Sequence, residues 1–288
     1  MSQEINTKLQ RKTVGSGRWF ESNGTRLKKE VEGYINSAYE KVPEIDEKVI
    51  AGLCPHAGFR YSGPTAGYTL AAMKKNAMKH GTPDVCFIIG FSHSKRFEYA
   101  AVMDGASITS PIETSIIDHE SIELFMKGRE KIVCDYRPHN GEHSAENELP
   151  FVQCAFPGMK VVIVLVGTHN QNVWKQVSDG LKFVSEKKNI CVVASTDMLH
   201  DESHELVEKV DRKTMDLTVK MDIDGLNKNW SYENQIYCGI SAVIPTMQFC
   251  KELGCKIAIE LDLTNSEKIT GRYNSGWVVG YGACVFVI

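Results

Sequence analysis

The feature that most constrains the fold of this chain is the regular alternation of short apolar runs with amphipathic segments. The runs are rich in β-branched residues, are continuous rather than alternating, and include KVIAGLCPH, DVCFIIGFSH, KVVIVLVGT and NICVVASTDMLH. Continuous runs are typical of strands that are covered on both faces, and the segments between them have the spacing of helices. The sequence therefore predicts an α/β fold with a mainly parallel central sheet and helices on both faces.

The length of the chain is compatible with one large core or with two modest ones. Across the 288 residues, no tract rich in proline, glycine or serine and no low-complexity segment interrupts the pattern. We therefore expect a single domain that spans residues 1–288.

Charge and cysteine content narrow the expected partners and compartment. A net charge of −3 favours neither a nucleic acid nor a membrane as a partner. No apolar run approaches the roughly 18 residues that span a bilayer, and the start, MSQEINTKLQRK, lacks the apolar segment of a secretory signal. The nine cysteines are scattered and form no C-x-x-C pair. Reduced thiols are the simplest explanation, so we expect a cytoplasmic protein, and a nuclear pool is also compatible.

Polar residues follow three of the predicted strands at the point where each strand ends. His56 stands in Pro55-His56-Ala57-Gly58, His93 in Gly90-Phe91-Ser92-His93, and Asp197 and His200 follow the run NICVVAS. In open α/β sheets, ligands bind beyond the carboxyl ends of the strands. One such histidine alone is most simply a hydrogen-bonded turn residue, but the three strand ends together favour a ligand site.

Cys238 and His143 each allow two interpretations. Cys238 stands just before a predicted helix, where the helix dipole favours the thiolate that binds metals. Alternatively, Cys238 is buried and inert. His143, in Glu142-His143-Ser144-Ala145-Glu146, is either part of a helix N-terminus or an acid/base group that faces the pocket. Neither a G-x-G-x-x-G nor a P-loop motif occurs, so a dinucleotide or phosphate-loop site lacks support.

These residues lie in elements that resemble those of the Memo family. The elements are short, occur in order and span nearly the whole chain. They are Pro55-His56-Ala57-Gly58 with Tyr61-Ser62-Gly63, Gly90 through His93, Glu142-His143-Ser144 with Glu146 and Leu149-Pro150, Ser195-Thr196-Asp197 with His200, and Cys238-Gly239. Two elements depart from the family pattern, namely Gly15-Ser16-Gly17-Arg18-Trp19-Phe20, which looks like a variant of A-G-S-W-Y, and Asp201-Glu202 after the histidine.

The resemblance implies a fold shared with class III extradiol ring-cleavage dioxygenases, which are non-haem iron enzymes. It implies a metal-ligand set of His56, His93 and Cys238, with iron or copper as the metal. It also implies redox chemistry, or cell motility signalling through phosphotyrosine-containing peptides. Further pocket positions that match the family are His143, Asp197 and His200.

Two functional hypotheses follow. In the first, the chain is a metal-dependent oxidoreductase in which His143 or His200 is the acid/base and Asp197 orients its neighbours. A thiolate ligand is softer than the carboxylate of extradiol enzymes and suits copper, iron or zinc, so ring cleavage does not follow from the ligand set. In the second, the chain is a non-enzymatic signalling scaffold whose histidines bind a phosphorylated peptide without metal. The expected ligand is thus a small molecule or a phosphorylated peptide.

Overall fold

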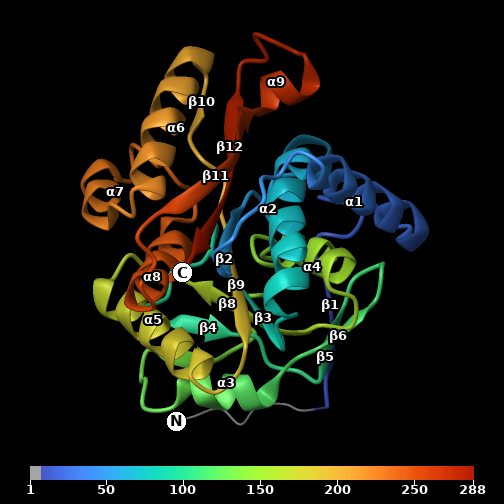
Figure 1. The fold of residues 1–288 in the computed structure, drawn as a ribbon, viewed down its shortest axis with the longest axis vertical. Helices are drawn as coiled ribbons and strands as arrows, with labels where there is room; N and C mark the ends of the chain where they lie inside the picture. Colours follow the sequence, from blue (N-terminus) through green and yellow to red (C-terminus); the bar gives the residue numbers. More distant parts are fainter. Residues whose placement is uncertain (1–7) are drawn as a thin grey trace.

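The computed structural model describes residues 8–288 and forms an α/β fold around a mixed nine-stranded sheet (Figure 1). The strand order is β10-β12-β2-β9-β3-β8-β4-β7, and β11 pairs with β12. These strands are β2 (Val49–Cys54), β3 (Val85–Phe91), β4 (Ala100–Val102), β7 (Ile132–Cys134), β8 (Lys160–Val166), β9 (Ile190–Ser195), β10 (His200–Asp201), β11 (Ala258–Asn265) and β12 (Val278–Val287). The predicted α/β class is confirmed.

The centre and the margins of the sheet differ in strand direction. The strands β2, β9, β3 and β8 are parallel to one another, correspond to the four apolar runs of the sequence, and are buried along almost their whole length. At the margins, β12 runs antiparallel to β2, and β4 runs antiparallel to β8. The sheet as a whole is therefore mixed.

Helices cover both faces of the sheet. On one face, α2 (Phe59–His80) packs against β2 and β12, with α1 (Gly24–Tyr39) and α4 (Leu149–Ala155) beside it; on the other, α8 (Ile240–Glu252) packs with α5 (Gln171–Ser185). The remaining elements are β1 (Gln10–Lys12), β5 (Ser107–Thr109), β6 (Thr114–Ile116), α3 (His119–Met126), the 3-10 helix η1 (Glu146–Glu148), α6 (His204–Val219), α7 (Ile223–Asn229) and α9 (Ser266–Thr270).

Local sequence explains why the helices form where they do, and α1 is an example. Its buried side chains, Leu27, Val31, Ile35 and Ala38, recur at helical spacing and face the core. At its start, Asn23 Oδ1 accepts a hydrogen bond from Arg26 N at 3.0 Å, which satisfies one of the backbone donors that a helix leaves free. Most buried apolar side chains of the protein join one connected core. Within residues 8–288, no helix is both long and apolar enough to cross a membrane.

The register of the central strands places three chain segments at one edge of the sheet. Cys54 at the end of β2 is paired with Ser195 at the end of β9, and Ile89 in β3 is paired with Ala194. Thr196 N then donates to Cys54 O at 2.9 Å, so the two chains leave the sheet side by side. The residues that follow β2, β3 and β9 therefore meet beyond this edge, which is where the site lies.

Candidate metal centre

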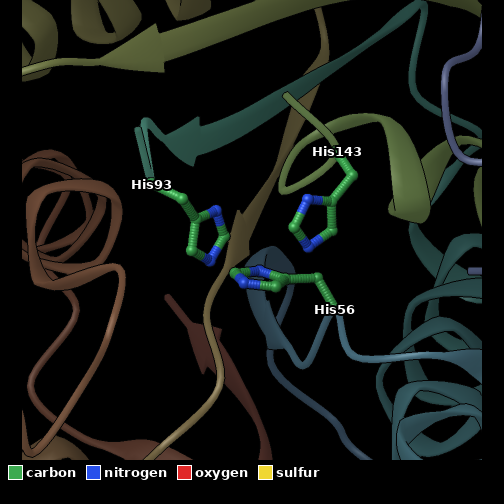
Figure 2. Close-up of side chains that lie close together, drawn as sticks. All are labelled: His56, His93 and His143. Atoms are coloured by element: carbon green, nitrogen blue, oxygen red, sulfur yellow. The ribbon is translucent and has the colours of Figure 1, made fainter. Parts of the chain in front are cut away.

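Three histidines from separate parts of the chain converge beyond the strand ends (Figure 2). His56 follows β2, His93 follows β3, and His143 lies shortly before η1. Each offers one ring nitrogen, and these three nitrogens all lie within 4.8 Å of one another. His56 is buried, His143 is partly buried, and His93 has 36% of its side chain exposed, so the group is reachable from the His93 side.

His56 is held from behind by hydrogen bonds. Its Nδ1 lies 2.9 Å from Ser195 Oγ, and the Ser195 hydroxyl donates to Ser144 O at 2.6 Å. Because that hydroxyl proton is used, the Nδ1 atom of His56 is the donor, and its Nε2 keeps a free lone pair. Burial lowers the pKa of His56 well below its usual range, and the neighbouring histidines lower it further. The imidazole is therefore a neutral donor at pH 7.

Glu142 fixes the second histidine. Its carboxylate accepts hydrogen bonds from His93 Nδ1 at 2.8 Å and from the backbone N–H groups of His93, His143 and Ser144 at 2.7–2.9 Å. Burial raises the pKa of Glu142, but these hydrogen bonds and the charge of His93 outweigh burial and hold the pKa at about 2. A carboxylate on Nδ1 leaves Nε2 of His93 as the free donor, an arrangement common behind metal-bound histidines.

His143 is placed by ring stacking. Its ring lies parallel to that of Trp19, with centroids 3.9 Å apart and planes at 6°, and it also stacks on His93 at 4.7 Å and 12°. Burial lowers the pKa of His143 to about 4, and the nearby His93 acts in the same direction. His143, predicted as an acid/base group, therefore lies in the histidine cluster itself and is neutral at pH 7.

Cys238 lies against the cluster, immediately before α8. Its Sγ is 3.6 Å from His56 Nε2 and accepts a hydrogen bond from Asp197 N at 3.2 Å. The helix dipole predicts a lowered pKa for this thiol, but burial and the charge of Asp197 raise it instead. Without a cation nearby, Cys238 is therefore a protonated thiol, because burial penalises the thiolate more than the helix end stabilises it.

Asp197 lies between the backbone of His56 and the side chain of His200, and its own backbone N–H contacts Cys238. Asp197 Oδ1 accepts hydrogen bonds from His56 N at 2.8 Å and from Ala57 N at 3.3 Å, and its Oδ2 lies 3.9 Å from His200 Nε2. Burial raises the pKa of Asp197 to about 7 and lowers the pKa of His200 to about 4. Among the described residues, His200 Nε2 has no hydrogen-bond partner although it is buried. This pair therefore combines a carboxyl that titrates near neutrality with an unsatisfied ring nitrogen.

Two cavities border the cluster. One of about 280 Å³ opens onto His93 and Cys238 and is lined further by His169, Trp230 and Tyr232. The other, of about 560 Å³, lies beyond Trp19. The first gives a ligand direct access to His93 and Cys238. The second is separated from His143 by the Trp19 ring.

Sequence reasoning placed His56, His93, Cys238, Asp197 and His200 at one site, and the structure brings them together there. It did not identify the side chains that orient them, which are Trp19, Glu142, Glu148 and Ser195. Glu142 could have been identified from the sequence, because it stands next to His143. Glu148, whose Oε1 lies 2.8 Å from Ser195 Oγ, carries no such signal.

The donor set is chemically suited to a transition metal. Neutral imidazole nitrogens bind iron, copper and zinc, and a thiol that loses its proton to a cation adds a soft ligand. Within residues 8–288, the ligand atoms that lie within 4.8 Å of one another all belong to histidines, so no carboxylate completes the set used by extradiol enzymes.

Comparison with known proteins gives the family. The model of the family described as Memo-like protein matches residues 11–285. A MEMO1 family protein of Thermoplasma volcanium is 31% identical over 276 residues, covering 96% of this chain and 97% of that protein. Relatives with the same family name include one from Thermoplasma acidophilum, 30% identical over 86% of this chain and 90% of that protein, and one from Methanopyrus kandleri, 27% identical over 96% and 99%. The chain belongs to the Memo family.

Proposed function

We propose that this protein is a metal-binding oxidoreductase whose centre is formed by His56, His93 and Cys238, with His143 close enough to supply a fourth donor. The observation that carries this proposal is the convergence of three histidine ring nitrogens beside a thiol. His56 and His93 each use Nδ1 in a hydrogen bond, so both can present Nε2 to one ion. Iron or copper fits a redox role, and zinc fits the same donors.

The bound metal would supply the electron transfer or oxygen chemistry that amino-acid side chains lack. The chain itself positions the donors and handles protons. Glu142 orients His93, and Ser195 orients His56. Asp197, with a pKa raised to about 7 by burial, can hold or release a proton at its Oδ2 next to His200. The cavity bordered by His93 and Cys238 is the access route for a small substrate.

The proposal includes a fold shared with class III extradiol dioxygenases, but it does not include their ring-cleavage reaction. The carboxylate of Glu142 bonds His93 Nδ1, and Oδ1 of Asp197 is occupied by the backbone N–H groups of His56 and Ala57. A thiol in place of a carboxylate alters the charge and softness of the site. The nine free and buried thiols further support a reducing compartment such as the cytoplasm.

The alternative is a signalling scaffold that holds a phosphorylated peptide on the same histidines. Burial lowers the pKa of His56 well below its usual range and that of His143 to about 4, so these two imidazoles offer no positive charge to a phosphate. The geometry therefore favours a cation over an anion at this position. Unchanged phosphopeptide affinity in a His56→Ala, His93→Ala double variant would separate such binding from the histidine cluster.

Metal analysis of protein purified without chelator tests the proposal. We expect about one ion of iron, copper or zinc per chain, and loss of most of that metal in His56→Ala, His93→Ala and Cys238→Ala. His80→Ala is the matched control, because its Nε2 bonds Asp46 O near the end of α2 and lies outside the cluster. Metal at background level in the wild type, or equal content in all variants, would contradict the proposal.

A further inference from the structure

The cavity beyond Trp19 has the walls and size of a small-molecule site. Its volume is about 560 Å³, within the range of roughly 300–1,000 Å³ typical of ligand pockets. Trp19, whose other face stacks on His143, forms one side, and Trp277, Val279 and Tyr281 form apolar or aromatic parts of the rest. The cavity is therefore adjacent to the histidine cluster but contains none of its ring nitrogens.

Three arginines give this cavity a positive charge that no acidic side chain offsets. Arg18, Arg60 and Arg272 line it, and the lining contains neither aspartate nor glutamate. Arg60 donates to Tyr61 Oη at 2.6 Å, and its guanidinium lies 4.5 Å from the centre of that ring. Within the described part of the chain, none of the three forms an ion pair with a carboxylate. In a protein of net charge −3, such a cluster indicates a site for an anion.

Hydrogen bonds fix the segments that carry the arginines. The turn with Arg18 is closed by Trp19 N, which donates to Gly15 O at 2.8 Å, and Phe59 N donates to Trp19 O at 2.9 Å beside Arg60. This places two of the arginines on one connected wall.

The opposite wall is formed by α9 and the loop that follows it, and α9 lies beside α2 (Figure 1). The buried Glu267 accepts hydrogen bonds from Ser275 N at 2.7 Å and from His204 Nδ1 at 2.8 Å, which holds the loop with Arg272 and Trp277. The cavity is thus preformed, and preformed sites lose less entropy when a ligand binds.

We propose that this cavity binds a small organic anion, whose carboxylate or phosphoryl group pairs with Arg18, Arg60 and Arg272 and whose apolar or aromatic body lies against Trp19 and Trp277. Guanidinium groups bind both kinds of oxyanion through paired hydrogen bonds. The site goes beyond the proposed function and does not require metal in the centre. It also assigns anion recognition to the arginines and not to the histidines.

Titration of metal-free protein with phenyl phosphate, benzoate and the neutral benzyl alcohol tests this site, with calorimetry and tryptophan fluorescence as readouts. We expect saturable binding of at least one anion, about tenfold tighter than binding of the alcohol. Arg18→Gln, Arg60→Gln and Arg272→Gln should each weaken it about threefold, and the triple variant about thirtyfold. Arg26→Gln is the control, because Arg26 is exposed on α1 and lies 3.6 Å from Glu21.

The outcomes separate the possible sources of the anion. Preference for phenyl phosphate assigns a phosphoryl group, and preference for benzoate assigns a carboxylate. Absence of saturable binding of both anions at millimolar concentration, equal affinity for the alcohol, or binding only of a tyrosine-phosphorylated peptide would overturn the proposal. Circular dichroism checks that the variants are folded. If the triple variant is unfolded, the affinities of the three single variants provide the test. Unchanged metal content in the arginine variants keeps this test distinct from that of the metal centre.

Discussion

The histidine cluster and the arginine-lined cavity share Trp19 as a wall but treat charge in opposite ways. In the cluster, burial lowers the pKa values of His56 and His143 and raises that of Asp197 to about 7, so burial disfavours the charged form of these three groups. In the cavity, the arginines are exposed to solvent and remain charged. The lone pair of a neutral imidazole nitrogen can bind a cation, whereas guanidinium groups without a carboxylate partner attract an anion. The two sites thus differ both in burial and in residue type, because imidazole loses its proton on burial whereas guanidinium keeps it.

The largest effect is expected where the buried cluster still holds a true charge, at Glu142. Glu142→Gln should weaken metal binding about 10- to 100-fold, because His93 loses the carboxylate that orients its ring and increases its basicity. Competition with a chelator measures the affinity, and Glu44→Gln is the control because Glu44 lies at the surface, paired with Lys75. Equal metal affinity in the Glu142→Gln variant and the wild type would mean that Glu142 is not part of the centre.

A second buried acid tests whether burial alone removes charge. Asp211 has one partner, Leu199 N, which donates to its Oδ1 at 3.1 Å; its Oδ2 has none among the described residues. Burial raises the pKa of Asp211 to about 8 in the folded state, against about 4 in an unfolded chain. Because the folded state holds the proton more tightly, the stability from this group is fully present below about pH 4 and is lost as the pH rises through about 8.

Asp211→Asn should therefore flatten the dependence of stability on pH. Urea unfolding at pH 5, 7 and 9 measures it, and the variant should gain on the order of 5 kcal/mol relative to the wild type at pH 9 and on the order of 1 kcal/mol at pH 5. The amide oxygen introduced by this substitution can still accept the hydrogen bond from Leu199 N. Parallel pH profiles for the two proteins would show that Asp211 is already ionised in the folded state.

Substitution of Trp19, which separates the cluster from the arginine-lined cavity, should expose His143 to solvent. Trp19→Leu exposes His143, so we expect the pKa of His143 to rise from about 4 by about one unit in metal-free protein. Histidine-selective NMR titration measures this value. Trp277→Leu, which lies across the cavity, should leave it unchanged. An unchanged pKa of His143 in the Trp19→Leu variant would show that residues other than Trp19 bury this histidine.

The smallest effect on metal affinity is expected for a substitution in the arginine-lined cavity that leaves the histidine cluster unchanged. Arg60→Gln should keep metal affinity within about twofold of the wild type, because substitutions at separate sites act almost independently. Chelator competition under the same conditions as for Glu142→Gln gives the comparison. A large loss of metal affinity would show that the histidine cluster and the arginine-lined cavity act as one site.

The part of the site carried by the strand ends could be predicted from the sequence. Continuous apolar runs identified β2, β3 and β9, and parallel neighbours bring His56, His93 and the residues after Ser195 to one edge. Memo family membership, indicated by the ordered motifs, is confirmed. The ligand set itself stays a prediction that metal analysis decides.

Other features depend on contacts that no local pattern encodes. The predicted sheet is mainly parallel, but β12 pairs antiparallel with both β2 and β11, which makes the sheet mixed. The stacking of Trp19 on His143 joins residues that lie far apart in the sequence. At Cys238, the sequence shows the adjacent helix but not the depth of burial, and burial decides the direction of the pKa shift.

The segment between β11 and β12 lies beyond the end of the sheet and contains Arg272 and Trp277 (Figure 1). His56 and His93, in contrast, follow strands at the centre of the sheet. Substitutions in this hairpin tip would alter the lining of the arginine-lined cavity and leave the strand ends that carry His56 and His93 in place. Among the arginines and tryptophans that line the cavity, only Arg272 and Trp277 lie in this separate segment, because Trp19 contacts His143 and Arg60 follows His56 closely in the sequence.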